Sequence, residues 1–405
     1  MAADAELEPA ITAEGLPPFE HRTAQRVFIT GATGYLGAFI LERLLRTSEV
    51  DCVCLVRAST REKGFERIRD AMKVYRIWDD SFAARIHAVL GDIAKPELGI
   101  EQQEFAELAR DVDVIYHCAA LVNFIYPYSA LRAPNVRGTH EVLRLATSVK
   151  LKPVHYTSTV DVLLGTHMQR PFYEDDESVL HEPNEIPDGY GRSKLIAEKM
   201  LANARARGVP VVIYRPGLIM GHTTTGATQT NDYLLVGLKG YIDLGMLGEP
   251  NIMIDFVTVD FVAEAIVHLS TQRESIGRYF HIWNPRPVHM GRAYDWIDSF
   301  GYHLKVVPAS VLKEKVLKEV DISNVLYPFL PLFRALRDNP PISSHDPKVM
   351  EKINLFDECR NTIDGLERSG IEFSSLDEAQ AHRCLSYLVS IGFLPKPAGY
   401  AEQLN

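Results

Sequence analysis

The sequence predicts an α/β protein built on a doubly wound parallel sheet, followed by a smaller, mostly helical domain. Six apolar runs of strand length alternate with helical patterns, and they are apolar throughout, as in strands covered on both faces. These runs are RVFIT, DCVCLV, IHAVLGD, DVIYHCAA, PVHYTST and VPVVIYRPG. The pattern changes after about Met220, and from about Pro285 it becomes mixed and mostly helical with proline breaks. The remainder from about Pro285 is expected to form most of a smaller second domain.

The 405 residues are enough for two domains. Residues 1–24 are acidic, carry three prolines and show no periodicity, so they predict a linker or docking arm. We expect residues 25–220 with 251–284 to form the sheet domain, because MIDFVTVDFVAEAIVHLS restores a strand and a helix. Residues 221–250 with 285–405 are expected to form the smaller subdomain.

Composition narrows the function classes. The net charge of -10 argues against wholesale nucleic-acid binding. No apolar run reaches the length of a membrane span, and the acidic start lacks the features of a signal peptide, so we expect a cytoplasmic protein. The five cysteines are scattered and partly inside apolar runs, which favours buried thiols in a reducing compartment. Cys52 and Cys54 have no second pair at ligand spacing, so no metal site is expected.

The stretch TGATGYLG, residues 30–37, places three glycines between a strand and a helix. Gly31 permits a tight turn, Gly34 lets the backbone approach a diphosphate, and Gly37 lets the helix pack closely on the sheet. The helix that follows offers its positive amino end to an anion. A purely structural turn is the alternative, but the strand, turn and helix context favours a nucleotide site.

The glycine spacing is GxxGxxG rather than GxGxxG, and the second strand ends in Arg57 rather than in an acidic residue. A carboxylate at this place would repel a ribose 2'-phosphate, whereas a guanidinium binds it with charge-assisted hydrogen bonds. The sequence therefore predicts NADP(H). Arg67 is the second expected phosphate contact, with Lys63 as the alternative. The other basic residues between Arg57 and Arg76 are interpreted as a solvated helix face.

Tyr190 and Lys194 form a YxxxK pair at the start of a helical run, so both side chains lie on one helix face. An adjacent ammonium and a nicotinamide ring are expected to lower the pKa of the Tyr190 phenol toward the working range. A hydroxyl at the end of the fifth strand would orient the carbonyl oxygen of a substrate. Thr157, Ser158 and Thr159 are all candidates for it.

These motifs together resemble the extended short-chain dehydrogenase/reductase superfamily. They are TGATGYLG, Arg57, HCAA, NVRGT, TST, YGRSK and YRPGLIMG. The resemblance is closer to thioester reductase domains, which end nonribosomal peptide and polyketide synthases and carboxylic acid reductases. It rests on VFITGATGYLGAFILERLL, CLVRA, VDFVAEAI and the LPP-containing lead-in, and covers about residues 5–285.

The resemblance implies a Rossmann domain with a carboxyl-terminal substrate domain, and catalytic residues Thr159, Tyr190 and Lys194. It implies an NADPH-dependent reductase that releases an acyl or peptidyl thioester from the phosphopantetheine arm of a carrier protein. The product is an aldehyde, which some members reduce again to an alcohol. No nucleic acid or membrane partner is expected, and the chain should be a monomer or part of a larger synthase.

The residues expected to bind NADPH lie in the glycine turn, at the carboxyl ends of the strands and in the catalytic helix. They are Thr30, Gly31, Thr33, Gly34, Tyr35, Leu36, Gly37, Arg57, Arg67, Gly91, Asp92, Ile93, Cys118, Ala119, Ala120, Asn135, Thr157, Tyr190, Lys194, Pro216, Gly217 and Ile219.

Three further features carry weaker expectations. The insertion at 168–189 falls where the superfamily places loops over the site, and its acidic run is interpreted as solvated. Cys118 is interpreted as a packed strand residue. The apolar segment 324–333 could line an acyl tunnel, but core packing is favoured.

Three other functions stay open on the sequence. A nucleotide-sugar epimerase or dehydratase shares the glycines and YxxxK, but Arg57 argues against its tightly bound NAD. A redox sensor or scaffold that binds NADP(H) without turnover would not need Tyr190 with Lys194. A stand-alone fatty acyl-CoA reductase differs only in what carries the acyl group.

Overall fold

The computed structural model describes residues 2–20, 24–165, 171–181, 183–335, 350–351, 354–373 and 376–400. Its contacts divide the chain into two units. The first, here called the sheet unit, contains residues 1–217, 259–283 and 355–373. The second unit contains residues 218–258, 284–354 and 374–405.

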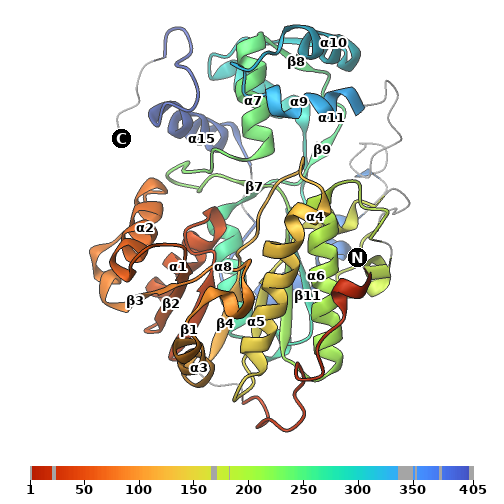
Figure 1. Cartoon of the computed structure of the whole chain (residues 1–405). Helices are drawn as coiled ribbons and strands as arrows, with labels where there is room; N and C mark the ends of the chain where they lie inside the picture. Colours follow the sequence, from red (N-terminus) through yellow and green to blue (C-terminus); the bar gives the residue numbers. More distant parts are fainter. Residues whose placement is uncertain are drawn as a thin grey trace. The chain divides into compact units, whose positions relative to one another are not determined.

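The sheet unit is built on a seven-stranded sheet in the order β11-β6-β5-β4-β1-β2-β3, and all its strand pairs are parallel (Figure 1). The strands are β1 (Arg26–Thr30), β2 (Asp51–Val56), β3 (Ile86–Leu90), β4 (Val114–His117), β5 (Val154–Thr157), β6 (Val211–Pro216) and β11 (Tyr279–Ile282). The predicted doubly wound sheet is confirmed. Strand order reverses between β1 and β4, and in such sheets ligands bind outside the carboxyl ends of the strands at this point.

Helices pack on both faces because the strands are apolar throughout. The α-helices of this unit are α1 (Tyr35–Thr47), α2 (Arg61–Val74), α3 (Gln102–Asp111), α4 (Tyr128–Leu131), α5 (Gly138–Thr147), α6 (Gly189–Ala206), α8 (Val259–Ser270), α13 (Leu355–Glu358) and α14 (Arg360–Leu366). Helix α1 packs against α2 and α8, whereas α5 packs against α3 and α6.

Short helical turns join these elements. They are η1 (Ala2–Ala5), η2 (Asp80–Arg85), η3 (Pro96–Gly99), η5 (Val160–Leu163), η6 (Glu177–His181) and η7 (Arg273–Ser275), together with the π-helix η4 (Arg132–Arg137). In the described part of the chain, no helix combines the length and the apolar character needed to cross a membrane.

The second unit combines helices with three two-stranded sheets, in which β7 pairs with β10, β8 with β13 and β9 with β12. Its strands are β7 (Ile219–Met220), β8 (Met246–Gly248), β9 (Met253–Ile254), β10 (Val257–Thr258), β12 (Val288–His289) and β13 (Lys305–Val307). Its helices are α7 (Tyr233–Leu244), α9 (Met290–Ser299), α10 (Ala309–Glu319), η8 (Tyr327–Phe329), α11 (Leu330–Ala335) and α15 (Glu378–Ser390).

The apolar segment 324–333 lies in the core of the second unit. Leu326, Leu330 and Phe333 are buried in a cluster with residues of β13 and α10. Leu326 also packs so closely on α7 that a Cβ at Gly240 would lie 2.3 Å from its Cγ. A cavity of about 60 Å³ remains between this segment and α7. The segment therefore packs as core.

The division of the chain differs from the expected one at two longer stretches and at residues 218–220 and 284, which belong to the second unit. Residues 355–373, expected in the smaller subdomain, belong to the sheet unit, whereas 251–258, expected in the sheet domain, belong to the second unit. The physical reason is packing. Gly365 on α14 lies so close to α8 that an added Cβ would be 2.4 Å from Leu269 Cδ2, and its carbonyl accepts from Gln272 Nε2 at 2.7 Å.

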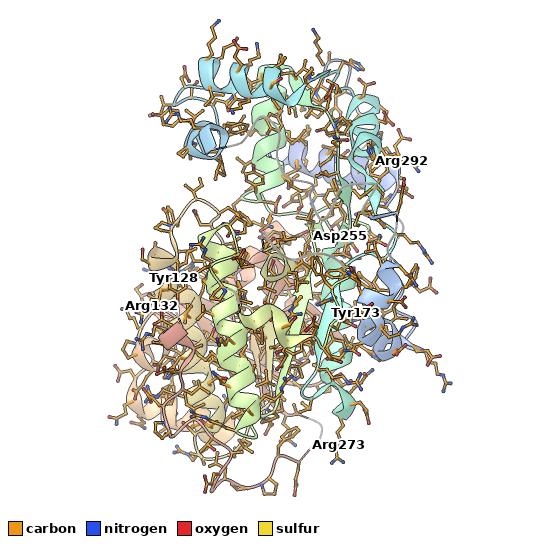
Figure 2. All side chains as sticks on the ribbon, turned by 90° about the vertical axis from the view of Figure 1, so that its right-hand side faces the viewer. Tyr128, Arg132, Tyr173, Asp255, Arg273 and Arg292 are labelled. Carbon is orange, nitrogen blue, oxygen red and sulfur yellow. The ribbon has the colours of Figure 1, made fainter. Side chains whose placement is uncertain are left out.

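The amino-terminal residues pack on the sheet unit, although the sequence shows no periodicity there. Asp4 accepts hydrogen bonds from Tyr128 (2.8 Å) and from Arg132 Nε (2.9 Å), both of which Figure 2 labels. The Arg132 guanidinium holds the pKa of Asp4 down at about 2. Asn203 on α6 donates to the carbonyl of Ala5 at 3.0 Å. The start of the predicted arm is thus tied to α4 and α6.

Candidate active site

The glycine turn connects β1 to α1 and comes very close to the end of β4. Gly31 has φ +84°, and an added Cβ would lie 2.7 Å from the backbone nitrogen of Ala119. A Cβ at Gly37 would lie 2.1 Å from the Gly31 carbonyl oxygen. Gly37 therefore packs the helix on the turn itself, whereas the sequence had suggested packing on the sheet. The closeness leaves room only for glycine at these two positions.

Gly34 differs from its two neighbours in the motif. An added Cβ would meet only the Gly31 carbonyl oxygen, at 3.2 Å, within 4 Å. Gly34 caps α1 without a side-chain hydrogen bond, unlike Thr60 at α2 and Asp188 at α6. The amino end of α1 is therefore open to an anion, and these residues fit the diphosphate of a dinucleotide.

The other residues of the motif are mostly engaged within the protein. The Thr30 hydroxyl lies 2.7 Å from His117 Nδ1 and accepts from the Ala119 N–H at 3.2 Å, so it positions the end of β4. The Tyr35 ring packs on Phe39 at 5.6 Å between ring centroids. Thr33 and Leu36 are half-buried.

The two predicted phosphate-binding arginines lie together beside the end of β2. Arg57 follows β2, Arg67 lies on α2, and both are exposed. Arg67 Nη1 donates to the Arg57 carbonyl. Lys63, the alternative to Arg67, is also exposed, in the first turn of α2.

The residues after β3 form a tight turn. A Cβ at Gly91 would lie 2.4 Å from the Leu98 carbonyl oxygen. Asp92 accepts from the Ala94 N–H at 3.0 Å, and Ile93 packs on α5, where a Cβ at Gly138 would lie 2.2 Å from its Cγ1. The three residues are half-buried at this strand end.

Cys118, Ala119 and Ala120 follow β4 and are also half-buried. The Thr157 hydroxyl donates to Cys118 Sγ at 3.4 Å. Burial raises the pKa of the Cys118 thiol to about 11, so it is protonated at neutral pH. The thiol is not an activated nucleophile, in line with a packing role.

Asn135 lies in the π-helix η4 and holds two parts of the site together. Its side-chain oxygen accepts from the Leu121 N–H at 2.7 Å, and its nitrogen donates to the Leu121 carbonyl at 3.1 Å and to Ser193 on α6 at 2.8 Å. Because π-helical turns occur often at functional sites, this turn in the sheet unit is a site feature. The buried Asn135 therefore anchors the loop after β4 to α6.

Tyr190, Lys194 and Thr159 converge where β5 ends and α6 begins. All three are buried. Lys194 Nζ donates to the Thr157 carbonyl at 2.5 Å and lies 4.1 Å from the centre of the Tyr156 ring. The Thr159 hydroxyl donates to Asp161 Oδ2 at 2.9 Å, and Thr159 is a hydrogen-bond partner of the Tyr190 phenol. The remaining predicted positions are Pro216 at the end of β6, Gly217 after it, and Ile219 on β7 in the second unit.

The acid–base properties of the pair differ from the sequence expectation. Burial raises the pKa of Tyr190, and the carboxylates of Asp161 and Asp188 raise it further, whereas the hydrogen bond with Thr159 lowers it. Burial lowers the pKa of Lys194 to about 7, while Glu198 and Cys118 raise it. The phenol is therefore protonated at neutral pH, and it is the lysine that titrates near neutrality.

Asp161, Asp188 and Glu198 act on the site but were not expected from the sequence. Asp161 follows Thr159 by two residues, and Glu198 follows Lys194 by one helical turn. Asp188 caps α6, accepting from the Gly191 N–H at 2.8 Å. The DGYG stretch was a signal for this cap. In the described residues, no group of three metal-binding side chains gathers.

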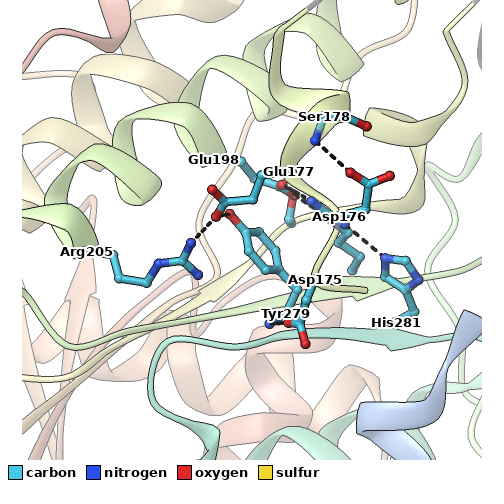
Figure 3. Close-up of polar contacts among 10 residues, drawn as sticks. Asp175, Asp176, Glu177, Ser178, Glu198, Arg205, Tyr279 and His281 are labelled. Atoms are coloured by element: carbon cyan, nitrogen blue, oxygen red, sulfur yellow. Dashed lines mark hydrogen bonds and ion pairs between the residues drawn. The ribbon is translucent and has the colours of Figure 1, made fainter. Parts of the chain in front are cut away.

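The acidic run in the insertion is partly buried, whereas the sequence suggested that it is solvated. Glu174 is buried and accepts hydrogen bonds from the His281 N–H at 2.8 Å and the Thr362 hydroxyl at 2.9 Å. Glu177 pairs with Arg205 and accepts from the Tyr279 hydroxyl at 2.8 Å (Figure 3). Residues 168–170 and 182 of the insertion lie outside the described residues. The acidic run packs because backbone and hydroxyl donors satisfy its carboxylates.

Comparison with known proteins places the chain in a family. The model of an NAD-binding family described as "Male sterility protein" matches residues 29–266. The chain is 41% identical over 303 residues to a linear gramicidin synthase of Brevibacillus parabrevis, a match that covers 74% of this chain and 6% of that protein. It is 32% identical over 392 residues to L-2-aminoadipate reductase of Schizosaccharomyces pombe, covering 93% of this chain and 27% of that protein. The chain thus spans less than a third of either relative.

Solved structures of similar fold match nearly the whole length of the chain. The terminal R domain from the myxalamid PKS-NRPS biosynthetic pathway has a TM-score of 0.89 and 37% identity, covering 98% of both chains. The reductase (R) domain of a nonribosomal peptide synthetase from Mycobacterium tuberculosis has a TM-score of 0.80 and 25% identity, covering 97% of this chain and 99% of that one. The chain therefore belongs to this NAD-binding family, and its predicted resemblance to the reductase (R) domains of peptide and polyketide synthases is confirmed.

Proposed function

We propose that this chain is a reductase that uses NADPH to release an acyl or peptidyl group, held as a thioester on the phosphopantetheine arm of a carrier protein, as an aldehyde. The observation that carries the proposal is the cluster of Thr159, Tyr190 and Lys194 beside the carboxyl ends of β4 and β5. It lies in the same unit as the open amino end of α1. Similarity to R domains supports the thioester as substrate.

Cofactor binding is assigned to the glycine turn and the basic residues after β2. The uncapped amino end of α1 would take the diphosphate, and Arg57 with Arg67 would take the 2'-phosphate that distinguishes NADPH from NADH. When bound, the nicotinamide supplies the hydride. Lys194, Thr157 and the small residues after β4 would hold the ribose end.

The residues of the chain act on the carbonyl oxygen. Tyr190, protonated because its pKa is raised, donates a hydrogen bond to the oxyanion that forms, and Thr159 donates a second one. Thr159 must then exchange its bond to Asp161 for one to the substrate. Tyr190 then passes its proton to the oxyanion and regains one from solvent. The neutral thiohemiacetal breaks its carbon–sulfur bond, its hydroxyl proton passes to the leaving thiolate, and free thiol and aldehyde result.

The test is turnover with defined substrates. The protein is incubated with NADPH or NADH and with acyl-pantetheine, acyl-CoA or acyl carrier protein thioesters, while nicotinamide absorbance and aldehyde or alcohol formation are followed. We expect oxidation of NADPH with aldehyde as product, and a loss of about 100-fold or more in Tyr190→Phe.

Tyr126→Phe is the matched control, because Tyr126 is exposed in the loop that follows β4. Absence of oxidation with every thioester, in wild type and Tyr190→Phe alike, would contradict the proposal and leave an epimerase, dehydratase or non-catalytic nucleotide binder. Turnover with acyl-CoA alone would point to a stand-alone acyl-CoA reductase.

A further inference from the structure

A fully buried ion pair lies directly behind the proposed active site. Glu198 is on α6 and Arg215 on β6, and neither side chain is exposed. Arg215 donates to Glu198 through Nη2 at 2.6 Å and through Nε at 3.1 Å. Such a pair is a weak source of stability, because removing both charges from water offsets their attraction. The position of this ion pair beside the proposed active site therefore suggests a role other than stabilising the fold.

Glu198 connects the pair to the reacting groups. Ser158 donates a hydrogen bond from its hydroxyl to Glu198. Ser158 stands between Thr157, whose carbonyl accepts from Lys194, and Thr159. Glu198 also follows Lys194 by one helical turn, and its charge favours the protonated form of that lysine. One carboxylate thus acts on both the lysine and the hydroxyl-bearing segment.

Arg215 is itself held from its other side. Its Nη1 donates to His281 Nε2 at 3.0 Å. Since a guanidinium can only donate, His281 Nε2 accepts, and its Nδ1–H donates to the Glu358 carbonyl at 2.8 Å. Figure 3 labels Glu198, Tyr279 and His281 among these polar contacts. The carbonyl belongs to α13, so the returning segment 355–373 supports the ion pair.

We propose that Glu198 is a positioning residue for thioester reduction: fixed by Arg215, it favours the protonated form of Lys194 and holds Ser158 so that Thr157 and Thr159 stay aligned with Tyr190. The proposal rests on the proposed function. Neither residue of the pair touches substrate; each acts through Lys194 and the end of β5.

The other groups that face Lys194 leave Glu198 as its counter-ion. They are His117 and Cys118 at the end of β4, Tyr156 on β5 and Tyr190 on α6. Burial and Lys194 lower the pKa of His117 to about 3, and burial raises the pKa of Cys118, Tyr156 and Tyr190. All four are therefore neutral near pH 7, and Glu198 carries the charge that acts on the lysine.

The experiment compares variants of the whole chain. Glu198→Gln alone leaves Arg215 buried without a counter-ion and can fail to fold, so the main variant is Glu198→Leu with Arg215→Met, which removes both charges. We expect this variant to fold and to bind NADPH. Its kcat should fall about 10- to 100-fold, since small misplacements of reacting groups are costly. In the profile of kcat against pH, the decrease at high pH should move to lower pH, because Lys194 loses its proton at a lower pH without Glu198. Ser158→Ala should lower kcat without moving that decrease.

Lys152→Met is the matched control. Lys152 lies just before β5 and is also buried, and burial also lowers its pKa to about 7. Its ammonium donates to the Leu145 carbonyl at 3.0 Å, away from the proposed site. We expect Lys152→Met to leave the decrease at high pH in place. Wild-type kcat and pH profile in the double variant, or an equal shift in Lys152→Met, would overturn the positioning role.

A second readout does not depend on turnover. NMR titration of ¹³C-labelled lysine side chains, with Lys194 assigned from Lys194→Arg, reports its pKa directly. We expect a lower pKa in the double variant than in wild type, and an unchanged pKa would contradict the proposal. If wild type reduces no thioester but this pKa shifts, the proposed function fails while the electrostatic role of Glu198 stands.

Discussion

The glycines of the TGATGYLG motif have different roles, and replacing each one with alanine distinguishes these roles. Gly37 has the Gly31 carbonyl oxygen where a Cβ would stand, at 2.1 Å, whereas Gly34 has open space apart from one contact at 3.2 Å. Gly37 is therefore required by the fold of the turn. Gly34 is required only if a ligand approaches the backbone there.

Gly37→Ala should therefore destabilise the protein by about 1–3 kcal/mol, the usual range for forcing extra volume into a packed site. Gly34→Ala should unfold at nearly the same urea concentration as wild type but should bind NADPH more weakly. Urea denaturation and fluorescence titration with NADPH measure the two effects. Equal stability losses in both variants would contradict this separation.

The exposed guanidiniums of Arg57 and Arg67 should decide between the two nicotinamide cofactors. Arg57→Ala removes a charge-assisted hydrogen bond of about 1.5–3 kcal/mol, so KM for NADPH should rise about 10- to 100-fold while KM for NADH stays the same. Lys73→Ala is the control, because Lys73 is exposed on α2, the helix that carries Arg67. Wild-type preference for NADH, unchanged in Arg57→Ala, would show that the 2'-phosphate assignment is wrong.

The sequence predicts the role of a single residue when its partners lie within a few positions of it along the chain. The spacing of Tyr190 and Lys194 places both on one helix face, and the glycine pattern predicts the turn. It does not predict that burial raises the pKa of Tyr190, because burial depends on the whole fold. Glu198 was missed for the same reason: its partners are Ser158, which follows β5, and Arg215 on β6, and only the sheet brings these two places beside α6.

Among the elements, the amino-terminal segment is the one whose packing the sequence concealed. It lacks periodicity because polar contacts at separate points and a few unevenly spaced apolar residues hold it: Ala5, Leu7 and Ile11 are buried in the core of the sheet unit. Asp4 bonds Arg132, the first residue of the π-helix that carries Asn135. The strands of the sheet were predictable by contrast, since continuous apolarity is a property of each run by itself.

Asp4→Asn should lower stability at neutral pH by about 1 kcal/mol, the range of a partly exposed ion pair with a hydrogen bond. The pKa of Asp4 is lowered to about 2, so its contribution is present above the ordinary value of 3.8 and is lost as pH falls toward 2. Denaturation at pH 7 and pH 3 tests this. Glu8→Gln, whose side chain is 60% exposed, serves as the control and should change little.

Over the whole molecule, the segment 355–373 is the feature that the sequence did not assign correctly. Its helical pattern looks like the rest of the carboxyl-terminal region. What distinguishes it is contact with residues nearly 190 positions earlier: the Asn361 N–H donates to Glu174 at 2.5 Å. No local pattern carries that information.

Glu174 should make the stability of the sheet unit depend on pH. Burial raises its pKa to about 7, against the ordinary 4.5. The folded state therefore holds the proton more tightly, and this contribution is complete below about pH 4.5 and lost as pH rises through 7. In Glu174→Gln, stability measured by urea denaturation between pH 5 and 8 should decline less than in wild type. Parallel curves for the two proteins would contradict this role, and Glu177→Gln is the control.

The path of the chain between its two units limits where a chimeric protein can be joined. The chain passes from one unit to the other at five junctions, after residues 217, 258, 283, 354 and 373. Exchanging the second unit with that of a relative therefore cannot be done at a single cut. A chimera has to replace three separate stretches and retain 355–373 from the host. A graft that carries everything from residue 284 onward would also replace 355–373, and with it the host's Glu358 carbonyl that holds His281 beside Arg215.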